Sequence, residues 1–157
     1  MKVEYINPFI DSTTSVFATM LNSKLVRSNL YIKRECTAEH EISGVIGLQG
    51  SMAGTVVLRL NRPTALAAAE IMIGEPQTEV NADVKDAVGE LANMVAGGAK
   101  AQLGGLNMNL TIPTVVTGTF AIEFPSQLPP ICVEFQSNWG PLTIEVCLVE
   151  QHAAATA

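Results

Sequence analysis

A run of apolar residues at helical spacing, between residues 82 and 103, constrains the fold of this chain more than any other feature. The residues recur every three or four positions, which is the spacing of one face of an α-helix. They are Val84, Val88, Leu91 and Val95. Asn81 is a suitable cap for the start of such a helix, and Gly104-Gly105 would stop it. The pattern predicts a long amphipathic helix from about Asn81 to Leu103.

Further segments on both sides of this helix have recognisable patterns. Helical spacing predicts a helix over 6–22 and a short alanine-rich helix over 63–73. Alternation and β-branched content predict strands at about 29–36, 42–48, 55–60, 107–112, 115–124, 131–138 and 141–149. Each half of the chain is then a helix followed by two or three strands.

This order predicts an α+β fold. We expect a two-layer domain: an antiparallel β-sheet with two long helices and one short helix packed on one face, in a pseudo-two-fold internal arrangement. We expect one domain over residues 1–150 and a flexible C-terminal tail over 151–157.

Composition and charge exclude several functional classes. The net charge is -6, and the nine Lys and Arg residues are scattered, so neither nucleic-acid binding nor a polybasic membrane patch is expected. No apolar run approaches the roughly 20 residues of a membrane span. The three cysteines, Cys36, Cys132 and Cys147, lack metal-ligand spacing and indicate free thiols in a reducing compartment. Because the N-terminus has no apolar leader, we expect a cytoplasmic protein.

The sequence gives only weak signals of other catalytic, metal-binding or interface residues. The two histidines are His40, in a charged segment beside Glu39 and Glu41, and His152 in the tail. Neither has ligand spacing around it, so no metal site is predicted. Serine and cysteine nucleophiles lack a plausible base. For Trp139, a core position capping a turn is favoured over an interface anchor.

The polar side of the long helix admits two interpretations. At about 100° per residue, one stripe lies opposite the apolar face; it consists of Asp86, Glu90, Asn93, Gly97 and Lys100. A solvated face is the ordinary explanation. However, asparagine is disfavoured inside helices, and each internal glycine costs about 0.5–1 kcal/mol relative to alanine. Gly89, Gly97 and Gly98 therefore indicate close approach, either of a partner or, as suits Gly98, of a neighbouring helix.

The stripe resembles a known signature. Asp86-x-x-x-Glu90-x-x-Asn93, followed by Pro113, is similar to the motif of the CheC/CheX/FliY chemotaxis phosphatases. The opening Asn7-Pro8-Phe9 and the segments 43–50 and 54–58 also resemble the CheX branch. The predicted first helix has no second Glu-x-x-Asn pair, which is again similar to that branch.

The resemblance implies an activity and a set of roles. It implies a protein phosphatase that hydrolyses the aspartyl-phosphate of a CheY-type response regulator. Asn93 would orient the attacking water, and Glu90 would engage the regulator's active-site lysine. The Mg²⁺ would belong to the regulator, with no cofactor bound by this chain, and the protein would be a homodimer. We expect Pro113 to be structural; the neighbours expected to contact the partner are Asp86, Gly89, Gly97 and Lys100.

Two other functions remain open from the sequence. The same face could serve a non-catalytic adaptor that binds a receiver domain or the flagellar switch. Alternatively, the glycine-bordered helix could be a subunit contact in a purely structural homodimer. The sequence does not identify the regulator, nor does it decide between chemotaxis and another two-component pathway.

Overall fold

The computed structural model describes residues 3–33, 40–118, 120, 122, 124 and 128–151. A short 3₁₀ helix (Val3–Tyr5) precedes the main elements. The helices are α1 (Asn7–Leu21), α2 (Arg62–Ile73) and α3 (Ala82–Gln102). The strands are β1 (Val26–Ile32), β2 (Ile42–Gly50), β3 (Met52–Leu60), β4 (Met108–Leu110), β5 (Thr114–Thr117), β6 (Ile131–Ser137) and β7 (Gly140–Glu150).

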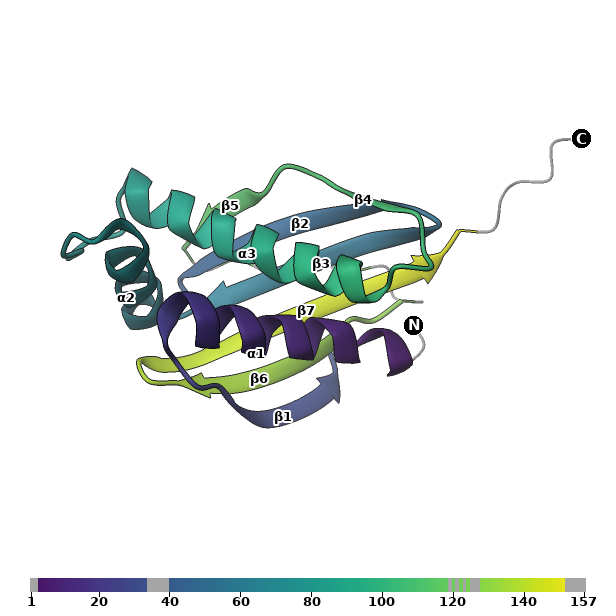
Figure 1. Cartoon of the computed structure of the whole chain (residues 1–157), viewed down its shortest axis with the longest axis horizontal. Helices are drawn as coiled ribbons and strands as arrows, with labels where there is room; N and C mark the ends of the chain where they lie inside the picture. Colours follow the sequence, from purple (N-terminus) through teal and green to yellow (C-terminus); the bar gives the residue numbers. More distant parts are fainter. Residues whose placement is uncertain are drawn as a thin grey trace, which may run out of the picture.

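The strands form one antiparallel sheet. Its order is β1-β6-β7-β3-β2-β4, and β5 also pairs with β2. Helices α1 and α3 lie across one face of this sheet, and α2 lies near one end of the pair (Figure 1). The predicted α+β two-layer architecture is therefore confirmed. None of the described helices is both long and apolar enough to cross a membrane.

The strand order also contains the predicted two-fold arrangement. The first half supplies α1, β1, β2 and β3, and the second supplies α3, β4 with β5, β6 and β7. The corresponding strands are β1 and β4, β2 and β6, and β3 and β7. When each strand is replaced by its counterpart, the sheet has the same strand order in reverse. The two halves meet where β3 pairs with β7 and where α1 contacts α3.

The hydrophobic core fills the space between the helices and the sheet. Phe9 and Phe17 of α1 are fully buried, as is the apolar face of α3. The sheet contributes alternate residues, such as Leu58 and Ile144, which are cross-strand neighbours. Alternation then directs the intervening residues, such as Arg59 and Glu145, to the opposite face of the sheet.

Several element boundaries differ from the sequence-based expectation. Strand β1 begins at Val26 instead of residue 29, and residues 34–36 lie outside the described part. The segment 49–54, left between the strands expected at 42–48 and 55–60, mostly continues those strands, because the chain reverses tightly around Gly50, whose φ is 130°. Strand β5 ends at Thr117, well before residue 124. Cys36, His152 and the rest of the expected tail beyond Gln151 also lie outside the described residues.

Candidate functional site

Helix α3 is the rigid support of the candidate site. It begins after Asn81, whose side-chain oxygen accepts a hydrogen bond from the backbone N–H of Val84 at 3.0 Å. The apolar face that was predicted from the spacing is completely buried against the sheet; its members are Val84, Val88, Leu91 and Val95. This burial fixes the rotation of the helix about its axis, so the direction of the opposite face is fixed too.

The polar stripe points away from the sheet, as predicted. Asp86 and Glu90 are exposed, and Asn93, Gly97 and Lys100 are partly exposed. Within the described residues, the side chains of Glu90 and Asn93 make no hydrogen bond or ion pair. A carboxylate and a carboxamide are thus held one helical turn apart on a stiff scaffold, with their hydrogen-bonding capacity unused by the rest of the chain.

The three glycines of α3 have different surroundings. At Gly98, an added Cβ would lie 2.3 Å from Ser12 Oγ of α1. Ser12 donates a hydrogen bond of 2.7 Å to the carbonyl of Val95, so helix packing explains Gly98, as expected. At Gly97, nothing lies within 4 Å of the added Cβ. Only Gly97 therefore leaves an open surface within the polar stripe.

Gly89 is not an exposed contact residue. It is buried, and an added Cβ would lie 3.3 Å from Val115 Cγ2 and 3.7 Å from Pro113 Cβ. Pro113, which lies between β4 and β5, and Val115 of β5 cover this position. The expectation that Gly89 directly borders a partner is therefore wrong, because the close approach is made within the domain. Pro113 packs over α3 at this position, and its structural role stays a prediction.

Another glycine, which lies in the sheet and which the sequence analysis missed, sets the distance between α3 and the sheet. A Cβ at Gly44 of β2 would lie 2.6 Å from the Cβ of Ala92 and 3.1 Å from the carbonyl oxygen of Val88. The helix can sit this close only because residue 44 has no side chain. The signal in the sequence was a glycine at an inward position of a strand, but its partner on α3 could not be identified without the fold.

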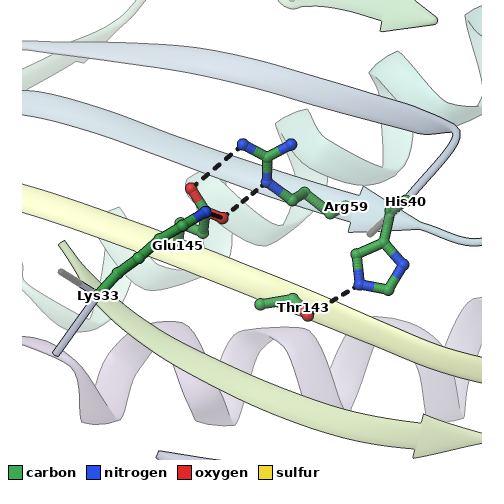
Figure 2. A network of polar contacts seen from close by, with 5 residues as sticks. All are labelled: Lys33, His40, Arg59, Thr143 and Glu145. Atoms are coloured by element: carbon green, nitrogen blue, oxygen red, sulfur yellow. Dashed lines mark hydrogen bonds and ion pairs between the residues drawn. The ribbon is translucent and has the colours of Figure 1, made fainter. Parts of the chain in front are cut away.

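A second polar cluster lies on the opposite face of the sheet, and Figure 2 shows its members. Glu145 of β7 accepts hydrogen bonds from Arg59 Nε at 2.7 Å and from Lys33 Nζ at 2.5 Å. The guanidinium of Arg59 lies 5.0 Å from the centre of the Phe120 ring. Because Lys33, Arg59 and Glu145 are all buried, this cluster offers no accessible chemistry to a substrate.

His40 belongs to the same buried face. The sequence placed it in a charged loop, but its exposed fraction is only 8%, and its Nε2 lies 3.0 Å from Thr143 Oγ1 (Figure 2). Among the described residues, no group of three histidine, cysteine or acidic side chains is arranged to hold a metal ion. Trp139, by contrast, lies in the β6–β7 turn and packs against the core, as the favoured interpretation had it.

The cysteines that the structure describes are structural. Cys132 and Cys147 are both free and buried. Burial, reinforced by the negative charge of Glu145, raises the pKa of Cys132 to about 12. The Cys132 thiol therefore stays protonated at neutral pH and is a poor nucleophile.

Comparisons with known proteins agree with the fold and with the family resemblance. Residues 42–136 match the family model described as chemotaxis phosphatase CheX. A relative from Thermotoga maritima, named CheY-P phosphatase CheX, is 33% identical over 82 residues, which are 50% of this chain and 53% of that protein. The match thus spans about half the length of that curated relative.

Two solved structures extend the likeness over nearly the whole chain. The chemotaxis protein CheX from Vibrio vulnificus has a TM-score of 0.86 and 34% identity, covering 94% of this chain and 100% of that one. A CheX–CheY–BeF₃–Mg²⁺ complex from Borrelia burgdorferi contains a chain with a TM-score of 0.78 and 22% identity, covering 95% and 100% respectively. The family match covers more than half of the sequence, and it includes the helix that carries Glu90 and Asn93: this chain belongs to the CheX family of chemotaxis phosphatases.

Proposed function

We propose that this protein accelerates hydrolysis of the aspartyl-phosphate on a CheY-type response regulator. The observation that carries the proposal is the outward-facing Glu90–Asn93 pair, whose side chains have no partner among the described residues. The names of the relatives support it, since one is called a CheY-P phosphatase and another was solved in a complex with CheY.

Asn93 is proposed to orient the attacking water. A carboxamide both donates and accepts hydrogen bonds, so it can hold a water molecule in line with the phosphorus atom. Phosphoryl transfer depends mainly on positioning and on stabilisation of charge, and the regulator's own lysine and Mg²⁺ supply the charge. The chain presented here then needs no nucleophile and no bound cofactor of its own.

Glu90 is proposed to fix the docking geometry. Its carboxylate is exposed one turn before Asn93 and can pair with the regulator's active-site lysine. Such a pair would place the carboxamide of Asn93 over the phosphoryl group. The remaining members of the exposed stripe, Asp86, Gly97 and Lys100, would border the contact.

The test is phosphate release from the phosphorylated regulator. We expect the wild-type protein to accelerate release and Asn93→Ala to lose about 100-fold of that acceleration, the size typical of removing one positioned hydrogen-bonding group. Gln102→Ala, which removes an exposed carboxamide from the last turn of the same helix, is the matched control and should retain activity. An Asn93→Ala variant as active as Gln102→Ala would refute the assigned role.

The adaptor alternative gives a different result in the same assay. An adaptor binds the phosphorylated regulator but leaves the lifetime of its phosphate unchanged or longer. No observation in the structure favours this alternative over hydrolysis.

We also propose a cytoplasmic homodimer. The free thiols of Cys132 and Cys147 suit a reducing compartment. Strand β1 is at the edge of the described sheet and exposes Val26, Leu30 and Ile32, a combination that favours pairing with a second copy. Light scattering should give twice the monomer mass for the wild type and a lower mass for Ile32→Lys; a monomeric wild type would refute the dimer.

A further inference from the structure

The sheet edge beside α3 contains a β-bulge. Strands β4 and β5 both pair with β2, through the pairs Leu110–Leu48 and Thr114–Val45. Leu110 and Thr114 are four residues apart in sequence, whereas their partners on β2 are only three residues apart. The extra residue is accommodated within 111–113. Bulges of this kind occur at sheet edges and next to active sites, where they redirect a side chain.

The bulge is held in place on both sides. The backbone N–H of Thr111 donates to the carbonyl of Gly47, and the N–H of Gly47 donates to Thr111 Oγ1, each at 2.9 Å. At the other end, Pro113 has a fixed φ and packs over Gly89 of α3. Residue 112 lies between these two anchors, so its position is set by the fold.

The residue at the centre of the bulge is Ile112, whose side chain is 87% exposed. The other large apolar side chains that are exposed in the described structure reach at most 59%. Single exposed apolar residues are common, so exposure alone carries no argument. What distinguishes Ile112 is its place in the chain: it directly precedes Pro113, which packs over Gly89 of α3, and Gly89 directly precedes Glu90.

We infer that Ile112 is an apolar contact for the receiver domain and is covered when Glu90 and Asn93 dock onto the phosphorylation site. The inference rests on the proposed phosphatase function and adds a specificity residue to it. A polar pair alone gains little on binding, because water already satisfies its hydrogen bonds. An adjoining apolar contact stabilises the complex and excludes water other than the one held by Asn93.

The experiment compares Ile112→Ser with Ile71→Ser, an exposed isoleucine on α2. Phosphate release is measured against the concentration of phosphorylated regulator, and the dissociation constant is measured separately with the regulator held active by beryllofluoride. We expect Ile112→Ser to raise both the KM and the dissociation constant about tenfold with kcat unchanged. Ile71→Ser should match the wild type, and the thermal midpoints of both variants should show that they fold.

The outcomes separate the two proposals. If the wild type accelerates release and Ile112→Ser has wild-type KM and dissociation constant, the contact is refuted and the phosphatase stands. If the wild type binds without accelerating release, and Ile112→Ser weakens that binding, the phosphatase fails and the contact stands. A change in oligomeric mass of Ile112→Ser without a change in regulator binding would assign Ile112 to a contact between copies, and would overturn the inference.

Discussion

Two groups of polar side chains, on opposite sides of the sheet, invite comparison. One is the buried cluster of Lys33, Arg59 and Glu145 on the face away from the helices (Figure 2). The other is the exposed pair of Glu90 and Asn93 on the outer side of α3. Each contains a carboxylate and groups able to donate hydrogen bonds. The buried carboxylate has its cations within the same chain, whereas the exposed pair has no partner in the described structure.

The difference shows how burial separates structural from functional polar groups in this protein. A charge removed from water is tolerated only when it is paired, so Glu145 must be bound by its own chain. An exposed group is satisfied by water, and a partner can replace that water. The less connected cluster is therefore the better candidate for recognition, although the buried one has the more conspicuous network of charges.

The largest expected effect comes from breaking the buried cluster. Glu145→Ala leaves Lys33 and Arg59 buried without their shared anion, and should lower the free energy of unfolding by about 3–5 kcal/mol. Urea denaturation measures this loss. Glu90→Ala is the matched control, since removing an exposed carboxylate should change stability by less than about 0.5 kcal/mol. Equal losses in the two variants would contradict the comparison.

The next largest effect separates two adjacent glycines on α3. Gly98→Ala should destabilise the protein by about 1–3 kcal/mol, because its Cβ would collide with Ser12 Oγ. Gly97→Ala has open space and should stabilise the helix by about 0.5–1 kcal/mol. If the regulator approaches over Gly97, the same variant should raise the KM for phosphorylated regulator. A stabilised Gly97→Ala with wild-type KM would remove Gly97 from the contact.

The smallest effect concerns the charge of the exposed pair. Glu90→Gln keeps the size of the side chain but removes the charge that is proposed to meet the regulator's lysine. We expect about a tenfold increase in KM, which is about 1.4 kcal/mol, and a weaker dependence of KM on salt. Asp86→Asn, one turn earlier on the same stripe, is the control and should change KM less. An unchanged KM and salt dependence for Glu90→Gln would argue against the lysine contact.

Much of the fold could be predicted because its signals are local. Helix α3 was placed within a residue of its observed ends, since its cap, period and terminal glycines all lie within the segment itself. The outward direction of Glu90 and Asn93 followed from the same periodicity. Their catalytic roles stay predictions, because they depend on a partner that is absent from the structure.

The errors arose where distant segments meet. The sequence showed that Gly89 was unusual but not that Pro113 and Val115 cover it. It placed His40 in a charged loop, but it did not show that packing brings this histidine against Thr143, 103 residues away. Nothing in the local pattern marks such pairs.

The amino-acid sequence by itself determined the periodicity of α3, the strands and the outward placement of the Glu90–Asn93 pair. These features depend on interactions between residues a few positions apart, so a short stretch of the sequence is enough to predict each of them. Only the tertiary structure decided that Arg59 meets Glu145, that Gly89 is covered and that a bulge displays Ile112. These outcomes depend on the register between strands, where a shift of one residue would send every side chain to the other face.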